Sequence, residues 1–416
     1  MFHVGTTAIP TQAIIYSPRA QNNKIELLHE TSLYDIRETK SPPADELTVL
    51  DNLRLFTLEA ALTRVPEAFF AAKPLEAEMA LNSVRDASGI LRLLLSGGHS
   101  TVAGRLAGAF RRIGRGDLAG EIVSAMRAAE HNVPESDPFA EAPWVGRRVG
   151  AGEAAIIRRL HGLWALTRDT VLATFPKPPG LPGDREAYLR TVDEIYLTDA
   201  YHSLSIEGYE VTPELIERVR TGAWSPETNQ EDRISRSAMA ARGYWQAFNA
   251  VKRGVSSVLA GAPAAELARD AHREWYRELF QPSVAAGNLA PAALAGYRNE
   301  FVYLKTSRYV PPRWEVVRDA MPTLFDLMVT EPEPSVRAVL GHWLIGYIHP
   351  YMDGNGRIAR FLMNFMLASG GYPWTVIHLE DRNRYLSALD RASIDQDIQP
   401  FARFIAERIA PITPHP

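Results

Sequence analysis

The spacing of apolar residues changes near Leu47 and divides the chain into a short strand-rich beginning and a long helical remainder. Before that point, three short apolar runs separated by Pro, Asn and Ser predict β-strands. These runs are Ala13–Tyr16, Ile25–Leu28 and Leu33–Ile36. From Leu47 to about Glu130 apolar residues recur at helical spacing, which predicts helices. We therefore expect a small α+β domain over residues 1–140.

Helical spacing continues beyond that domain and is interrupted mainly by clusters of Pro and Gly. The strongest interruption is the Pro-rich segment 176–183, which ends a predicted helix. We assign residues 141–183 to this connecting helix and the Pro-rich linker that follows it. Residues 184–416 are expected to form a second, mainly α domain, in which Gly254 is expected to interrupt a helix. Within it, the segment 296–312 instead predicts a β-hairpin with a polar tip.

A polar loop between two apolar segments runs from His349 to Arg360 and has the sequence HPYMDGNGRIAR. Apolar residues at helical spacing precede this loop over 336–348 and follow it over 361–367. The loop therefore joins two buried helices. Because it is far more polar than either neighbour, we expect it to face a cleft.

This loop combines a flexible glycine pair with two cationic side chains. Gly354 and Gly356 allow left-handed backbone conformations around Asn355, and such a turn can direct successive N–H groups toward one anion. The second helix begins there, so the positive end of its dipole faces the same space. Arg357 and Arg360 share a face of its first turn and oppose that dipole unless a polyanion lies between them. A nucleotide triphosphate meets this requirement.

Two further side chains of the loop can take part in chemistry. Asp353 supplies a carboxylate, which together with phosphate oxygens suits Mg²⁺. His349, whose ordinary pKa is about 6.5, can accept a proton from a hydroxyl group near neutral pH. Seven polar or conformationally special residues within nine positions are not expected by chance in one chain. The loop is therefore expected to be functional.

The loop resembles the signature of Fic-domain proteins, His-Pro-Phe-x-Asp-Gly-Asn-Gly-Arg-x-x-Arg, with Tyr351 in place of the usual Phe. The resemblance implies a mainly helical fold and the transfer of AMP from ATP to a hydroxyl group of a target protein. It implies that His349 is the general base and that Asp353 is the Mg²⁺ ligand. It also implies a phosphate cradle, and two clamps on the distal phosphates. The cradle is Gly354, Asn355 and Gly356, and the clamps are Arg357 and Arg360.

A second motif, Ser203-x-x-x-Glu207-Gly208, lies at the predicted end of a helix upstream. Gly208 suits a helix C-terminus, and the helix dipole opposes the carboxylate of Glu207 in the last turn. Arg360 has the opposite conflict at a helix start, so each can relieve the other. The motif resembles the inhibitory motif of Fic proteins whose inhibitory helix precedes the catalytic loop. The resemblance implies that Glu207 pairs with Arg360 and displaces the γ-phosphate of ATP, which predicts an autoinhibited enzyme.

Two other parts of the chain are assigned by their position in the family. The expected hairpin resembles the flap of Fic proteins, where Val302, Tyr303 and Leu304 would pair with an extended segment of the target. Asn383 and Tyr385 fall on the helix that borders the adenine pocket in the family. The same residues also fit an ordinary surface hairpin and ordinary helix packing and capping.

Composition and charge limit the remaining functions. The chain has 416 residues, a net charge of −4 and no cysteine, which argues against a strongly basic nucleic-acid binder and excludes a disulfide framework. No apolar run approaches a membrane span and no signal peptide is recognised, so a cytoplasmic protein is expected. The expected cofactors are ATP and Mg²⁺. The expected partner is a target protein, and self-modification and a homodimer are both compatible with the sequence.

Two alternatives stay open. Glu207 could position a water molecule and remove AMP from a target, as some Fic proteins with this glutamate do. Alternatively, residues 1–140 could supply a regulatory function while the loop only senses nucleotide; this region resembles the C-terminal half of abortive-infection antitoxins. Its arginine cluster could contact nucleic acid or an acidic partner, or form a solvated helix face. The cluster is Arg105, Arg111, Arg112 and Arg115.

Overall fold

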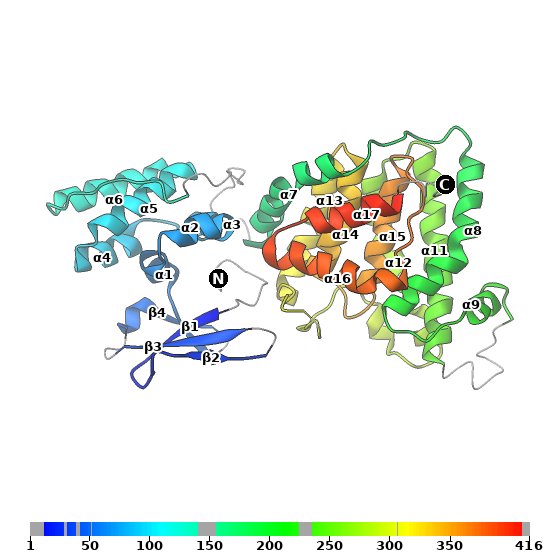
Figure 1. Ribbon diagram of the computed structural model, residues 1–416, viewed down its shortest axis with the longest axis horizontal. Coiled ribbons are helices and arrows are strands. Elements are labelled where there is room, and N and C mark those ends of the chain that lie inside the picture. The colour runs from blue at the N-terminus through cyan, green and yellow to red at the C-terminus, as the bar shows by residue number, and fades with distance from the viewer. Residues whose placement is uncertain are drawn as a thin grey trace, which may run out of the picture. The chain divides into compact units, whose positions relative to one another are not determined.

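The computed structural model describes most of the chain (Figure 1). The described residues are 12–28, 31–38, 42–50, 52–139, 155–223, 235–305 and 307–409. They divide into two compact units, Met1–Leu166 and Thr167–Pro416. Residues 1–11 and 140–154, which fall in the expected first domain and linker, lie outside the described residues. The described part is mostly helical with a small strand region near its start, which confirms the expected fold class.

Two small sheets form the beginning of the first unit. In the first sheet, β3 (Ser32–Arg37) pairs in parallel with β1 (Gln12–Ser17) and antiparallel with β2 (Lys24–Glu26). These strands fall on the three apolar runs, which confirms that prediction. In the second sheet, β4 (Leu47–Leu50) pairs antiparallel with β5 (Leu53–Phe56).

The second sheet corrects the expectation that helices begin at Leu47. Leu53 and Leu55 alternate with Arg54, which is the period of a strand. Before them, Asn52 has a φ of 63°, a left-handed conformation that Asn adopts more readily than most residues. A tight connection followed by alternating side chains favours a hairpin, so the helices start only after Phe56.

Six short helices complete the described core of the first unit, and an extended segment follows them. The helices are α1 (Leu58–Arg64), α2 (Ala68–Ala72), α3 (Pro74–Asn82), α4 (Ser88–Gly97), α5 (Ser100–Arg112) and α6 (Gly116–Ala128), after the 3₁₀ turn η2 (Ala44–Glu46). The extended segment returns along α5, where a Cβ atom on Gly104 would lie 1.8 Å from the carbonyl oxygen of Pro134. A Cβ atom on Gly108 would lie 1.9 Å from the carbonyl oxygen of Ser136. This close approach therefore requires glycine at both positions.

The same extended segment neutralises part of the arginine cluster on α5. The Nε atom of Arg111 lies 2.7 Å from Glu135, and Arg112 lies 3.7 Å from Asp137. Because both pairs are largely exposed, each contributes little to stability, but each reduces the positive field of the helix. This pairing favours the interpretation of the cluster as a solvated helix face.

The second unit consists of long helices. One helix, α7 (Ala155–Thr174), contributes residues to both units. The others are α8 (Arg185–Ile206), α9 (Pro213–Arg220), α11 (Arg236–Leu259), α12 (Ala264–Ala285), α13 (Val317–Thr330), α14 (Pro334–Ile348), α15 (Asn355–Ala368), α16 (Arg382–Asp390) and α17 (Gln399–Ile409). Short 3₁₀ turns are η3 (Pro291–Leu294), η4 (Trp314–Val316) and η5 (Leu379–Asp381), and a π-helical turn, η6 (Arg391–Asp395), follows α16. No described helix is long and apolar enough to cross a membrane.

Helices α14 and α15 form the interior of this unit, with α11 and α12 packed against α15 and α8 packed against α11 (Figure 1). The expected break at Gly254 is absent, because α11 continues through it. A Cβ atom on Gly254 would lie 2.5 Å from the ring of Phe365 on α15. The glycine therefore permits close helix packing rather than ending a helix.

The β-hairpin expected over 296–312 is not seen in residues 296–305 and 307–312, the part of this segment that the structure describes. The described residues of this segment are irregular, with an isolated bridge at Tyr309. Pro311 and Pro312 have no N–H group to donate to a strand ladder. The side chain of Arg298 donates to the carbonyl oxygens of Glu300 and Pro312, which occupies two acceptors that a ladder would use.

Replacing Gly104 by Ala is expected to destabilise the first unit by about 1–3 kcal/mol, because the added methyl group would overlap the Pro134 carbonyl. Gly120→Ala is the matched control, since Gly120 is likewise the fifth residue of a 13-residue helix and has open space beside it. Ala is expected to stabilise that position by about 0.5–1 kcal/mol. Chemical denaturation followed by circular dichroism measures both. Equal effects of the two substitutions would contradict the close packing at Gly104.

Candidate active site

The loop that joins α14 to α15 begins and ends with a left-handed residue. His349 caps α14 with φ 51° and ψ 60°, and its N–H group donates to the carbonyl of Ile345 at 2.8 Å. Pro350 follows and cannot continue the helix. At the other end, Gly354 precedes α15 with φ 82°. The histidine is therefore fixed at the C-terminus of one buried helix, directly beside the N-terminus of the next.

The side chain of Asn355 holds the loop closed. Its Oδ1 atom accepts from the N–H of Tyr351 at 2.9 Å, and its Nδ2 atom donates to the carbonyl of Tyr351 at 2.8 Å. The ring of Tyr351 is buried and stacks on Tyr276 at 3.9 Å between centroids, so the position that is Phe in the Fic signature keeps an aromatic packing role. The amide of Asn355 is thus used within the loop. The groups available to an anion are the main-chain N–H groups of the first turn of α15.

Arg357 lies beneath this helix start and is almost completely buried. Its guanidinium lies between the rings of Tyr209 and Phe280, at 5.2 Å and 5.0 Å from their centroids. One terminal nitrogen is 3.3 Å from Asp353, and its Nε atom has no hydrogen-bond partner among the described residues. A buried cation with an unused donor favours an anion in the same place.

Arg360 is also buried, and it meets the end of α8. Its Nε atom donates to the hydroxyl of Ser203 at 2.8 Å, and an Nη atom donates to the carbonyl of Ser203 at 3.0 Å and to Glu207 at 2.7 Å. Burial lowers the pKa of Arg360, but the carboxylate of Glu207 more than offsets this and holds the pKa above its ordinary value. The structure thus brings Ser203 and Glu207 of the second motif into contact with Arg360 of the loop, although they are far apart in the sequence.

The carboxylate of Glu207 lies directly over Gly356. A Cβ atom on Gly356 would be 2.3 Å from Oε1 of Glu207, so only glycine leaves room for the carboxylate. After Glu207, Gly208 has φ 85° and ends α8 as the sequence predicts. The anionic side chain therefore lies against the first turn of α15, where the resemblance places the phosphates.

The imidazole of His349 is surrounded by charged groups of both signs. Burial lowers its pKa to about 4, and the charge of Arg298 acts in the same direction. The backbone of Gly346 and the carboxylates of Glu207 and Asp353 act in the opposite direction. At neutral pH the ring is therefore unprotonated, which is the form that can accept a proton.

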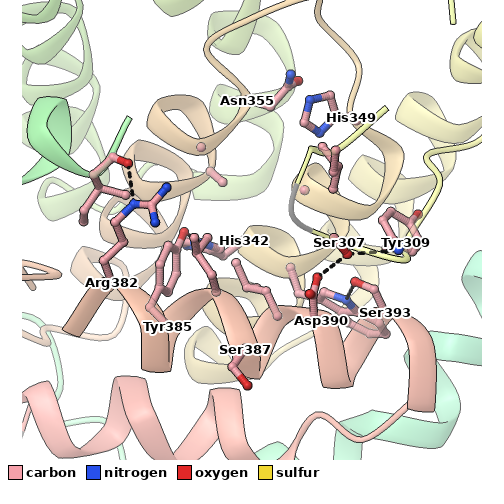
Figure 2. A pocket seen from close by; sticks show the side chains of 18 of the residues that line it. Ser307, Tyr309, His342, His349, Asn355, Arg382, Tyr385, Ser387, Asp390 and Ser393 are labelled. Atoms are coloured by element: carbon pink, nitrogen blue, oxygen red, sulfur yellow. Dashed lines mark hydrogen bonds between the residues drawn. The ribbon is translucent and has the colours of Figure 1, made fainter. Parts of the chain in front are cut away.

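A cavity of about 650 Å³ opens beside the loop and the end of α8 (Figure 2). His349, Asn355 and Gly356 line it together with Glu207 and Arg360. Of the positions assigned by resemblance, the cavity lining includes Tyr303, Leu304, Asn383 and Tyr385. Several other positions assigned from the sequence are not among its lining residues, namely Ser203, Gly208, Val302, Asp353, Gly354 and Arg357.

The wall of the cavity formed by α16 carries several polar contacts. The hydroxyl of Tyr385 is hydrogen-bonded to Nε2 of the buried His342 at 2.8 Å, so its own polar group is already used. Ser307 donates to Asp390 at 2.6 Å and connects the irregular segment to α16 (Figure 2). Arg382 donates to the carbonyl of Ile206 at 2.9 Å and connects α16 to the end of α8.

The residues near Asp353 fit a magnesium ion. The carboxylate is about half exposed (52%), while its neighbour Arg357 is buried. One carboxylate beside an anion-binding helix start is the ligand set that Mg²⁺ uses when phosphate oxygens and water complete its shell. Asp353 is therefore the residue that would hold the ion.

A second group of ligand-type side chains, His202, His378 and Glu380, lies near the end of α8. The Nδ1 atom of His202 accepts a hydrogen bond from the N–H of Leu379 at 3.0 Å. The neutral ring therefore carries its proton on Nε2. In a metal-bound histidine one ring nitrogen binds the ion and the other normally donates a hydrogen bond, whereas Nδ1 of His202 accepts one. This geometry favours a packed histidine over a metal ligand.

Three residues around the site had no role assigned from the sequence. Arg298 binds the carbonyl groups at the start of the loop, Arg382 binds the end of α8, and Phe280 packs on Gly354 and Arg357. The residues next to an arginine or phenylalanine in the sequence do not distinguish one that lies at a site from one that packs elsewhere in a helical protein. Only the place of Arg298 within the segment expected to form the flap could have indicated a role for it.

The fold and the site define a helical protein with a buried, cationic helix start beside an unprotonated histidine. Residues 265–367 match the model of the Fic/DOC family. A protein adenylyltransferase Fic of Nematostella vectensis is 40% identical over 124 residues, 29% of this chain and 28% of that protein. Protein adenylyltransferase fic-1 of Caenorhabditis elegans is 32% identical over 123 residues, 29% of this chain and 24% of that protein. The chain therefore contains a Fic domain, and the matches span about a quarter of each relative's length.

Two solved structures also resemble the chain. Fic-1 (aa134 - 508) from C. elegans covers 82% of this chain and 95% of its own, at 19% identity and a TM-score of 0.44. A Fic domain containing signaling protein from Bacteroides thetaiotaomicron covers 61% of this chain and 93% of its own, at 22% identity and a TM-score of 0.41.

The imidazole of His349 is expected to titrate with a midpoint near pH 4, because burial disfavours its protonated form. Its ring signals should therefore stay constant between about pH 8 and pH 6, where an exposed histidine would titrate. Histidine-selective isotope labelling and an NMR titration measure this. The signal that disappears in His349→Ala identifies the residue. A midpoint above about pH 6 would show that the ring is not desolvated.

Proposed function

We propose that this chain is an autoinhibited, Mg²⁺-dependent protein adenylyltransferase that moves AMP from ATP to a hydroxyl group of a target protein. The single observation that carries the proposal is the carboxylate of Glu207, which pairs with Arg360 and covers Gly356 at the anion-binding start of α15. A negatively charged side chain held in that place is the expected substitute for a phosphate group. The Fic domain and the names of the sequence relatives support the reaction class.

In the proposed reaction, the phosphates of ATP bind the first-turn N–H groups of α15, near the buried guanidinium of Arg357. His349 accepts the proton of the target hydroxyl while its oxygen forms a bond to the α-phosphorus of ATP. The bond from that phosphorus to the bridging oxygen breaks, and pyrophosphate leaves. Asp353 would hold Mg²⁺, which when bound supplies positive charge to the phosphate oxygens. Positioning and fixed charges supply most of the expected acceleration.

Autoinhibition follows from competition for Arg360. Its Nε atom and one Nη atom are already occupied by Ser203 and Glu207. A γ-phosphate that needs the same guanidinium must displace the carboxylate or bind in a different pose. Because the side chain of Glu207 is 26% exposed, it can leave without opening the core.

Replacing Glu207 by Gly is expected to raise the rate of AMP transfer about ten- to a hundredfold. A hydrogen bond to a charged group is worth about 1.5–3 kcal/mol, and this bond stabilises the inhibited state. Intact-mass analysis after incubation with ATP and Mg²⁺ measures self-modification, and transfer from ATP labelled at the α-phosphate measures modification of added proteins. Glu210→Gly, an exposed position three residues later, is the matched control. Equal labelling by wild type and Glu207→Gly would contradict autoinhibition.

Replacing His349 by Ala in the Glu207→Gly chain is expected to lower transfer by about 10²–10⁴-fold, which is the usual contribution of a general base. Binding of ATP, measured by calorimetry, should remain, because the N–H groups and arginines are unchanged. His99→Ala, an exposed histidine of the first unit, is the control. AMP removal from a modified protein by wild type, with no transfer by either Glu207 form, would instead support the hydrolytic alternative.

A further inference from the structure

Arg298 is a buried cation whose hydrogen bonds all end on the main chain. It is 2% exposed. Its Nε atom donates to the carbonyl of His349 at 2.7 Å, and an Nη atom donates to the carbonyl of Ile348 at 3.4 Å. Its own N–H group donates to the carbonyl of Pro350 at 2.9 Å. Through side chain and backbone, one residue thus binds the carbonyl groups of three consecutive residues centred on the histidine.

The remaining donors of Arg298 attach it to the irregular segment that precedes α13. Its Nη atoms donate to the carbonyl oxygens of Glu300, at 2.9 Å, and Pro312. The fork of the guanidinium therefore joins this segment to the catalytic loop. Lysine has no fixed fork of donors and could not make these contacts together.

We propose that Arg298 is a positioning residue, which holds His349 in its left-handed conformation at the end of α14 so that the ring faces the cavity. The inference rests on the proposed function. The last carbonyl groups of a helix have no partner within the helix, and a residue with positive φ needs support from its surroundings unless it is glycine. Arg298 supplies both a partner for the helix end and a restraint on the residue that follows it.

The charge of Arg298 has a second consequence for the ring. The C-terminus of α14 carries a partial negative charge, which would favour a protonated imidazole. Glu207 at the end of α8 and Asp353 in the loop act in the same direction. Arg298 opposes all three, and its removal is expected to raise the pKa of His349. The same guanidinium therefore contacts the backbone of the base and adds to the effect of burial in lowering the pKa of its ring.

The test uses the Glu207→Gly chain with Arg298→Met and Arg298→Lys. In both variants kcat is expected to fall about a hundredfold while KM for ATP changes less than about twofold, because misplacing a reacting group by about 1 Å has an effect of this size. Only Arg298→Met, which removes the charge, should move the NMR titration midpoint of His349 upward from its value in the Glu207→Gly parent chain. Arg253→Met is the control, since Arg253 pairs with Glu274 on the exposed surface of α11.

Unchanged kcat and an unchanged titration of His349 in folded Arg298→Met would overturn the proposal. A purely structural role would also overturn it, and would appear as a lower melting temperature with kcat and the titration of the remaining folded protein intact. If Arg298→Met does not fold, the kcat of Arg298→Lys is the test. The expected fall supports the proposal, and an unchanged kcat overturns it. If the parent Glu207→Gly chain transfers no AMP, the proposed function fails, but the titration of His349 in Arg298→Met still tests the role of Arg298.

Discussion

The buried guanidinium of Arg360 is the charge on which the second unit depends. A cation removed from water requires a partner, and removing one member of such a pair costs more than the pair itself contributes. The partners of Arg360 are Ser203 and Glu207, more than 150 residues earlier in the chain. Helix α8 must therefore pack where it does for α15 to be stable in the absence of another anion. One interaction fixes the position of a helix and also places a carboxylate over Gly356 at the start of α15.

The two members of that pair differ in burial, and under the proposed function this difference would let one anion replace another at Arg360. Arg360 is 4% exposed at its side chain, whereas Glu207 is 26% exposed and lines the cavity. The arginine is fixed by burial, whereas in the proposed reaction an anion that enters from the cavity would replace the glutamate. Ser203 would keep its contacts with Arg360 during such an exchange. The helix can thus stay packed while its terminal carboxylate changes place.

Local preferences predicted the ends of the loop from His349 to Arg360 only in part, because Gly354 is left-handed as expected whereas Gly356 lies within α15 and is not. The left-handed Gly354, the start of α15 beside it, and Gly208 at the end of α8 all follow from conformational preferences. The same conformational preferences gave wrong predictions where contacts with residues distant in the sequence determine the structure. Arg298 uses carbonyl groups that a hairpin over 296–312 would need, and packing against Phe365 explains a glycine that was expected to interrupt α11.

Two other outcomes show what local rules leave out. The amide of Asn355 fits an anion cradle by type, but its polar atoms are both used by the backbone of Tyr351. The left-handed conformation of His349 could not be predicted either, because no preference of histidine requires it. Both features result from closing a short loop between two helices whose positions are set by the core.

The ends of those two helices explain why the buried charges around the loop are placed as they are. The C-terminus of α14 is negative and the N-terminus of α15 is positive, and the two meet at the loop. Arg298 compensates the negative end, whereas Arg357 and Arg360 add to the positive one. Burial keeps the imidazole of His349 unprotonated, and the charge of Arg298 acts in the same direction. The buried guanidiniums of Arg357 and Arg360 at the start of α15 add positive charge that favours an anion there. Under the proposed function, the meeting of these two helix ends therefore places a neutral imidazole, kept so mainly by burial, directly beside a cationic helix start.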